Sequence, residues 1–178
     1  DGVANGDYII PIDAKPDTTI NTVGIKQNIT VTTNDILSTG ATSPSVKLCL
    51  ATDTIPNCTG STTTSYFDVA GQGRYAWVNT TGLSFQPCSS AGVPIASCTG
   101  PFVGTATPAT YKVTDSLGFS DTATYTPTVV PPPTVAPDTN TGPYDTNQVI
   151  NPLTNDSGSA AASLNPTTVK LCTTATAT

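Results

Sequence analysis

Residues 104–130 have the sequence GTATPATYKVTDSLGFSDTATYTPTVV, and this stretch decides the fold class. Tyr111 and Val113 alternate with polar neighbours, which is the two-residue period of a half-buried strand. Residues 115–118, DSLG, supply turn chemistry, and a second alternating run follows as far as Tyr125. The stretch therefore predicts a β-hairpin, which needs a second sheet to cover its apolar face.

The composition indicates an all-β protein. Charged residues make up 10% of the 178 residues, well below the roughly 25% usual in soluble domains. There is no Glu or Met, and no window has the apolar spacing of a long helix. Short strands separated by Gly, Pro and Asn predict an Ig-like antiparallel β-sandwich. The expected strands are 18–23, 27–32, 45–51, 63–70, 74–79, 83–86, 107–114 and 119–128, with an edge strand at 8–12.

The alternation also predicts the core. Trp77 is the only tryptophan, and we place it at the centre. Gly71 and Gly73 match a dinucleotide-binding pattern, but a strand rather than a helix follows them, so we expect a tight turn there. The other expected core residues are Ile29, Val31, Val46, Leu48, Phe67, Val69, Tyr75, Leu83, Phe85, Tyr111 and Val113.

The sequence contains an internal repeat, which predicts tandem modules. We divide the chain into a lead-in (1–14), a complete sandwich (15–130), a proline-rich linker (131–135) and the opening strands of a second copy (136–178). The second copy is too short to close a sandwich, so either the protein continues or these strands complete a neighbouring subunit by strand addition. At an offset of 121 residues, Pro16, Asp17, Gln27, Ile29, Thr33, Asn34 and Asp35 match Pro137, Asp138, Gln148, Ile150, Thr154, Asn155 and Asp156. A two-residue insertion then brings residues 46–49 (VKLC) onto 169–172.

The five cysteines predict two local disulfides. Cys49 and Cys58 are nine residues apart, and Cys88 and Cys98 are ten apart. Neither spacing fits a zinc knuckle or a redox CxxC motif, and no His is present to complete a zinc site. Cys172 is left without a partner within the chain. Paired cysteines in a chain of low charge point to an oxidising, extracellular compartment.

Charge and residue content argue against several function classes. The net charge is −6 with no basic patch, which argues against nucleic acid as a partner. The longest apolar run is too short to span a bilayer, so no membrane insertion is expected in this segment. Without His there is no Ser-His-Asp or Cys-His arrangement, and without Glu acid–base chemistry would rest on Asp alone. We predict that the protein is not an enzyme.

Modification and metal binding are weaker possibilities in the sequence. Four Asn-X-Ser/Thr sequons, at Asn28, Asn57, Asn79 and Asn155, are possible glycosylation sites. Residues 138–142, DTNTG, alternate oxygen ligands as a calcium loop does. The equivalent residues 17–21, DTTIN, do not preserve that spacing. We therefore predict no cofactor, with calcium as the one alternative.

Several segments together resemble a known family. In order they are residues 46–48 (VKL), 71–75 (GQGRY), 83–87 (LSFQP), 102–105 (FVGT), 107–116 (TPATYKVTDS) and 122–129 (TATYTPTV). They are similar to the CshA-type fibril repeat of bacterial surface adhesins, over most of residues 15–130 and the start of the second copy. The resemblance implies a secreted, cell-surface sandwich module repeated along a fibril, with ligand recognition in a separate region.

These observations predict a structural stalk module, extracellular and without catalysis, whose partners are neighbouring repeats of the same protein. Host or cell-surface ligands would be bound through another region. One alternative is a self-assembling fibre subunit completed by strand exchange. Another is a glycan- or protein-binding adhesion module that uses exposed aromatics such as Tyr66 or Tyr144.

Overall fold

The structure, a computed structural model, describes residues 10–89, 97–159 and 162–171, and it confirms an all-β sandwich. The described residues form nine strands, and the last three of them fall within residues 104–130. The strands are β1 (Asp17–Thr22), β2 (Gln27–Thr30), β3 (Ser45–Leu48), β4 (Tyr66–Val69), β5 (Gly73–Asn79), β6 (Gly82–Pro87), β7 (Gly104–Thr105), β8 (Ala109–Thr114) and β9 (Ser120–Val130).

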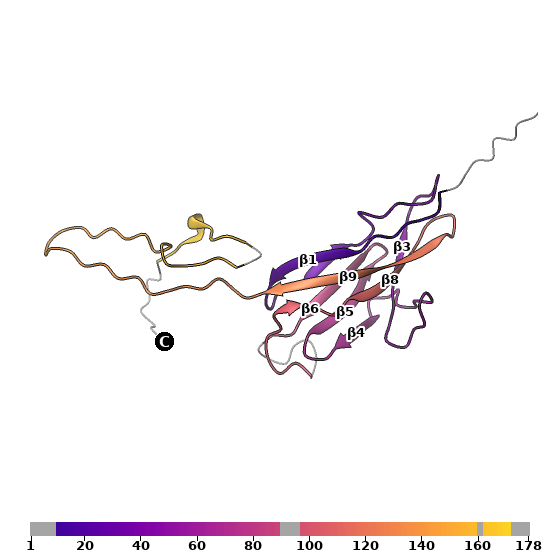
Figure 1. The fold of residues 1–178 in the computed structure, drawn as a ribbon, viewed down its shortest axis with the longest axis horizontal. Coiled ribbons are helices and arrows are strands. Elements are labelled where there is room, and N and C mark those ends of the chain that lie inside the picture. Colours follow the sequence, from indigo (N-terminus) through magenta and orange to yellow (C-terminus); the bar gives the residue numbers. More distant parts are fainter. Residues whose placement is uncertain (1–9, 90–96, 160–161, 172–178) are drawn as a thin grey trace, which may run out of the picture.

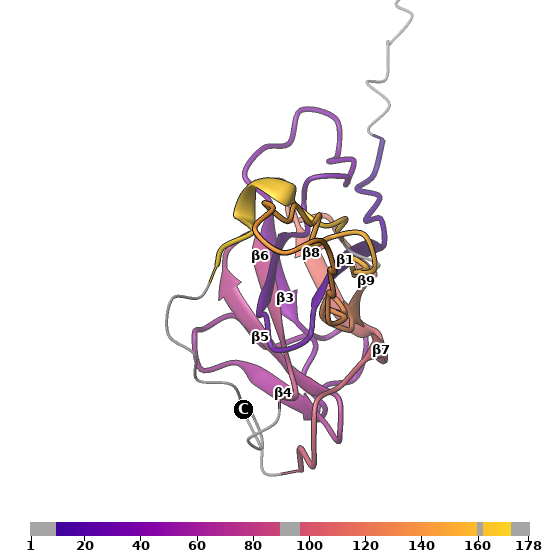
Figure 2. The ribbon, with the colours of Figure 1, turned by 90° about the vertical axis from the view of Figure 1, so that its left-hand side faces the viewer.

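The strands form two sheets. One has the order β1-β9-β8-β3, with β7 also paired to β9, and the other has the order β2-β6-β5-β4. Figure 1 shows the sheets stacked, and in the rotated view β4, β5 and β6 lie on one side while β1, β7 and β9 lie on the other (Figure 2). Each sheet turns one face inward, so alternate residues of both form a shared core.

The predicted hairpin is present. Strands β8 and β9 pair antiparallel from Ala109↔Tyr125 to Thr114↔Ser120. The turn is held by Asp115, whose Oδ1 accepts hydrogen bonds from the backbone N–H groups of Leu117 (3.0 Å) and Phe119 (3.1 Å). Gly118 has a φ of +85°, a left-handed conformation that glycine adopts without a steric penalty.

Strand β9 is longer than expected and has a parallel neighbour. We predicted a strand over residues 119–128, but β9 begins at Ser120 and continues through Pro127 to Val130. The missing N–H of Pro127 does not break the pairing, because its carbonyl still accepts a hydrogen bond from Ala106 N at 2.9 Å. On its other edge β9 pairs in parallel with β1, from Asp17↔Tyr125 to Thr22↔Val130.

The centre of the core is an aromatic cluster around Tyr75, not Trp77. Tyr75 is fully buried, and its ring centroid lies 4.7 Å from that of Phe85, 5.2 Å from Phe67 and 5.8 Å from Tyr125. Trp77 is only partly buried, because its indole N–H donates to Val46 O (2.9 Å) and holds the ring beside the cluster. Other buried residues include Val31, Val46, Leu48, Leu83, Tyr111, Val113 and Val129, together with Ile12 and Ala14, whereas Ile29 and Val69 are partly buried.

The two glycines of the predicted turn have different roles. Gly71 has a φ of +70° in the turn between β4 and β5, as expected. Gly73 lies in β5 itself, where a Cβ atom would come within 2.3 Å of Gln86 O and 2.8 Å of the Phe85 ring. Glycine at position 73 therefore permits the close approach of β5 and β6, and the turn expectation is wrong for it.

The remaining differences are local. The strand expected at 63–70 begins only at Tyr66, because residues 62–65 form a turn closed by Ser65 N donating to Thr62 O (2.8 Å). In the edge strand expected at 8–12, residues 8 and 9 lie outside the described residues, and residues 10–12 form no strand. Residues 131–159 and 162–171 hold two isolated bridges and a short 3₁₀ helix, η1 (Pro166–Thr168).

Candidate functional site

Two disulfides close loops that lie outside the paired strands. Cys49, just after β3, is bonded to Cys58, and Cys88, just after β6, is bonded to Cys98. These are the pairs that the cysteine spacing favoured. All four cysteines are buried. Each bond therefore ties the end of a core strand to the loop that follows it. Cys172, which we expected to be unpaired, lies outside the described residues.

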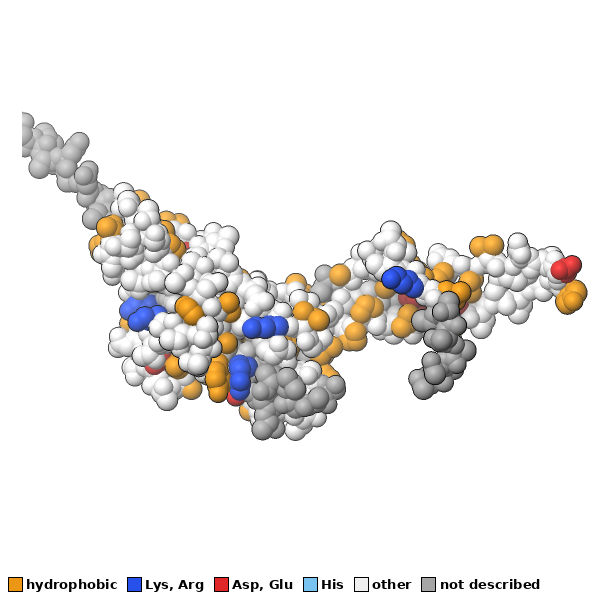
Figure 3. Space-filling model, turned by 180° about the vertical axis from the view of Figure 1, so that it is seen from behind, with side chains coloured by type: hydrophobic (Ala, Val, Ile, Leu, Met, Phe, Trp, Pro, Cys, Tyr) orange, Lys and Arg blue, Asp and Glu red, His pale blue; other side chains and the backbone are white. Residues whose placement is uncertain are grey.

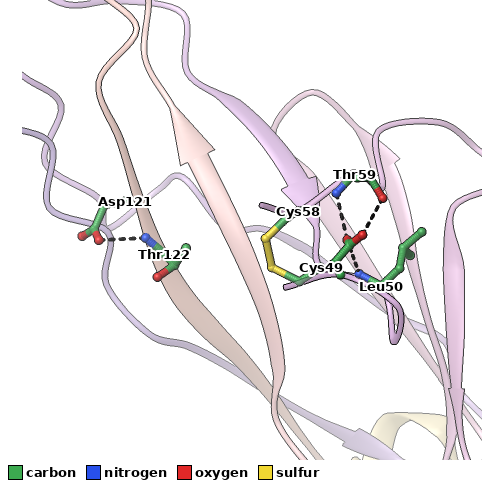
Figure 4. Close-up of a disulfide and its surroundings, with 7 residues drawn as sticks. Cys49, Leu50, Cys58, Thr59, Asp121 and Thr122 are labelled. Carbon is green, nitrogen blue, oxygen red and sulfur yellow. Dashed lines mark hydrogen bonds between the residues drawn. A yellow bond between two sulfur atoms is a disulfide. The ribbon is translucent and has the colours of Figure 1, made fainter. Parts of the chain in front are cut away.

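The first disulfide loop is further ordered by the side chain of Asp53, and Figure 4 shows the Cys49–Cys58 bond beside Leu50 and Thr59. Asp53 Oδ2 accepts hydrogen bonds from the backbone N–H groups of Leu50 (2.8 Å) and Thr59 (2.9 Å), and its Oδ1 accepts the Thr59 hydroxyl (2.8 Å). The hydrogen bond from Leu50 makes the largest contribution and that from Thr59 the next, and together they hold the pKa of Asp53 below its ordinary value. The carboxylate thus stays ionised and fixes both ends of the loop.

A buried tyrosine–carboxylate contact anchors the chain where it enters the sandwich. The Tyr111 hydroxyl lies 2.6 Å from Asp17 Oδ2 and 2.8 Å from Lys15 O. Asp17 is only 7% exposed, and burial, with a smaller contribution from nearby Asp35, raises its pKa to about 6 despite the Tyr111 hydrogen bond. Burial likewise raises the pKa of Asp35 and of the Tyr111 hydroxyl. No local pattern predicted this contact, because its partners are 94 residues apart.

The raised pKa of Asp17 predicts that the sandwich loses stability as the pH rises. The folded state binds this proton more tightly than the unfolded chain, whose Asp has a pKa near 3.8. The contribution of Asp17 to the free energy of unfolding is therefore complete below about pH 4 and is lost as the pH rises through 6. This contribution is at most about 3 kcal/mol. We expect urea unfolding to give a lower free energy at pH 7.5 than at pH 4.5. Asp17→Asn should flatten this slope, and an equal slope in the variant would contradict the assignment.

A second set of contacts, which we call the entry frame, precedes β1. Lys15 N donates to Asp35 Oδ1 at 2.8 Å, and Asn34 Nδ2 donates to Pro16 O at 3.1 Å. An isolated antiparallel bridge joins Asp13 to Ile36 beside them. The frame folds residues 13–16 against residues 34–36, so the chain enters the sandwich in a fixed direction.

The same entry frame occurs again 121 residues later. Ala136 N donates to Asp156 Oδ1 at 2.8 Å, and Asn155 Nδ2 donates to Pro137 O at 3.0 Å. The isolated bridge between Thr134 and Ser157 stands where Asp13 and Ile36 pair in the first frame. Corresponding hydrogen bonds of the two frames are therefore 121 residues apart, as are the matching residues of the sequence repeat.

Comparison with protein-family models finds one match, to the surface adhesin CshA repetitive domain, over residues 10–129. The chain belongs to this family. The matched residues hold nearly the whole sandwich, from the first entry frame to the end of β9, and both disulfides. Neither the search of curated proteins nor that of solved structures found a match. Membership of a surface adhesin family places the CshA repeat at the cell surface.

The four sequons of this CshA repeat are exposed but differ in their surroundings. Asn28 lies on β2, and Asn57 lies in the first disulfide loop. The Asn79 side chain accepts a hydrogen bond from Thr81 N (3.0 Å), and the Asn155 amide belongs to the second entry frame. A glycan is attached through the side-chain nitrogen, so it would disturb the hydrogen bond donated by the Asn155 amide and would leave the one accepted by the Asn79 oxygen in place. Glycosylation stays a prediction.

The remaining candidate groups are dispersed in this CshA repeat. Among residues 10–89, 97–159 and 162–171, no three Asp or Cys side chains come together as metal ligands. In the DTNTG loop, the Asn140 amide donates to Val149 O (3.1 Å). The described chain has no helix long and apolar enough to cross a membrane. Figure 3 shows the basic side chains as separate patches on the face drawn.

Proposed function

We propose that the chain is a non-catalytic spacer module of a filamentous, extracellular surface adhesin, built from tandem sandwiches that follow one another every 121 residues or so. One observation carries this proposal: the entry frame is formed twice, with the same atoms and nearly the same distances, at the offset of the sequence repeat. The partners of the module are then the copies before and after it.

Exposure of the second copy supports the view that it is the opening of another sandwich. Val46 and Leu48 are 2% and 0% exposed in the first copy, whereas their equivalents Val169 and Leu171 are 46% and 91% exposed. Apolar side chains at core positions need a second sheet to cover them. In the proposal, that sheet comes from the continuation of the same module.

The junction between the copies suits a spacer. Strand β9 ends at Val130, and the second frame begins with the bridge at Thr134, so only Pro131, Pro132 and Pro133 lie between them. Consecutive prolines favour the extended polyproline II conformation, which has no internal hydrogen bonds and is semi-rigid. A short, stiff connection keeps successive modules apart and limits bending.

The proposal is tested by the length of proteins that contain one, two and three complete copies. The 11 residues of β9 and the three prolines span about 45 Å, so each added copy should lengthen the particle by about that amount in small-angle X-ray scattering. A maximum dimension that barely grows with copy number would show that the modules fold back on one another and would overturn the spacer function.

Strand exchange between subunits is the alternative that the exposed side chains of the second copy also favour. In that case the 178-residue chain should form dimers or longer polymers during sedimentation velocity at micromolar concentration. The spacer function predicts a monomer.

An adhesion module that binds through aromatics is less well supported. Tyr66 is 48% exposed, but the Arg74 guanidinium covers its ring at 3.9 Å from the centroid. Tyr144 is fully exposed and makes the better probe. Binding of the chain to an immobilised glycan or matrix protein that is lost in Tyr144→Ala would favour this alternative.

A further inference from the structure

The first and last strands of the sandwich lie side by side and run in the same direction. β1 and β9 are in register over six residue pairs, and Val23 N donates to Val130 O (2.9 Å) just beyond the last of them. In Figure 1 both arrows point towards the end from which residues 131–171 continue. The chain therefore enters the pair at Asp17 and leaves it at the opposite end.

This arrangement decides how tension acts on the module. A pull on the two chain ends draws β1 backwards from Asp17 and β9 forwards from Val130, so the strands are forced to slide past each other. All the hydrogen bonds between them then resist together, whereas a pull on two strand ends at the same edge would open the bonds one at a time. We infer that β1 and β9 form a mechanical clamp that sets the force at which the module unfolds. This inference rests on the proposed spacer function, since only a module within a filament is pulled by its ends.

Buried and partly buried side chains brace the clamp. The hydroxyl groups of Thr19 on β1 and Tyr125 on β9 are hydrogen-bonded at 2.8 Å. Gln27 is 3% exposed, accepts a hydrogen bond from the Thr19 hydroxyl and donates through Nε2 to Thr128 O at 3.1 Å. Because Gln27 belongs to β2, it ties both strands of the clamp to the opposite sheet. Sliding β1 along β9 would leave the buried Gln27 amide and Tyr125 hydroxyl without these partners.

The segment through which a pull on the N-terminus reaches β1 is also held in place. Tyr111 on β8 is hydrogen-bonded to Lys15 O and Asp17 Oδ2, and Asp121 Oδ2 accepts a hydrogen bond from Ala14 N at 3.0 Å. These contacts attach residues 14–17 to the β8–β9 hairpin. They let the pull reach the β1–β9 pair as a sliding force and oppose peeling of the segment before it.

The direction of pulling provides the first test. The whole chain is placed between marker domains and stretched by atomic force microscopy from its N- and C-termini. In a second arrangement the force is applied between the C-terminus and an azide-bearing residue, Ile25→p-azidophenylalanine, in the exposed turn after β1. The second arrangement pulls β1 and β9 from the same end and should unfold the module at a several-fold lower force. Equal forces in the two directions would overturn the clamp.

A matched pair of variants provides the second test. Tyr125 and Tyr75 are both fully buried, and the hydroxyl of each makes one hydrogen bond at 2.8 Å, to Thr19 and to Thr107 O respectively. Only the Tyr125 bond crosses the clamp. Tyr125→Phe should raise the unfolding rate under tension by about fivefold, the factor that corresponds to one lost hydrogen bond, whereas Tyr75→Phe should change it much less. An equal effect in both variants, or a larger one in Tyr75→Phe, would overturn the inference.

Failure of the clamp is separable from failure of the spacer function. The spacer is judged by the length of proteins with one to three copies, with no force applied. The clamp is judged by unfolding force and its direction dependence. A weak module in a long particle would overturn the clamp alone.

Discussion

Replacing Tyr75 with alanine is expected to lower the free energy of unfolding by about 3–5 kcal/mol, the usual cost of removing a buried aromatic side chain. The ring contacts Phe67 and Phe85 in its own sheet and Tyr125 in the other, so its loss opens a cavity between the two sheets. The variant also leaves Thr107 O without the hydrogen bond that the Tyr75 hydroxyl donates. Urea unfolding followed by tryptophan fluorescence measures the loss.

Tyr66→Ala is the control for this variant. Tyr66 lies on β4 and is 48% exposed, and the Arg74 guanidinium lies over its ring, 3.9 Å from the centroid. Its replacement should cost less than about 1 kcal/mol, since the stacked guanidinium is at the surface. If the Tyr75 variant lost no more than the Tyr66 variant, the aromatic cluster would not be the centre of the core.

Removing both disulfides should cost about 5 kcal/mol in total. Each closes a short loop, with sequence separations of 9 and 10 residues, and the chain-entropy model gives about 2.7 kcal/mol for a loop of that length. The loops share no residues, so the two losses should be close to additive. A sum of this size is a large part of the 5–15 kcal/mol by which domains are usually stable.

The measurement compares Cys49→Ala/Cys58→Ala, Cys88→Ala/Cys98→Ala and the combination of all four changes with the unchanged chain in urea. Similar losses for the two pairs are expected, because their separations differ by one residue. A loss below 1 kcal/mol for both pairs would mean that the loops are already held by other contacts, such as the Asp53 hydrogen bonds in the first.

The hairpin shows why part of the fold could be predicted. In residues 109–130 the signals are local: apolar residues alternate on both strands, and DSLG supplies the turn between them. Strand β7 has only two residues, too few for a period, and it was missed. The parallel pairing of β1 with β9 joins residues more than 100 positions apart, and no local pattern specifies it.

The errors in the core have a common origin. Trp77 was placed at the centre because it is the only tryptophan, but its indole N–H needs a partner, and Val46 O provides one beside the core. Tyr75 and Tyr125 can lie deeper because their hydroxyls find partners in Thr107 O and Thr19. The polar group of each aromatic decided its depth, and partners this distant in the chain cannot be recognised from one sequence.

The two disulfides could be predicted because the spacing of the cysteines was sufficient to pair them. Loops of nine and ten residues make local pairing the simplest solution for four cysteines, and the structure forms both bonds. The entry frame was visible only as a repeated Asn-Asp, whose role needs the backbone partners at Lys15 and Pro16. The Asp17–Tyr111 contact had no counterpart in the sequence at all.

The disulfide loops also limit how far a ruptured module could extend. A filament under excessive force lengthens as each unfolded module extends, but the residues between bonded cysteines cannot extend. The two closed loops span 9 and 10 residue steps, so they hold back about 65 Å of contour per module at roughly 3.4 Å per step. Under reducing conditions this contour length is released as well, so each module would extend further when it unfolds.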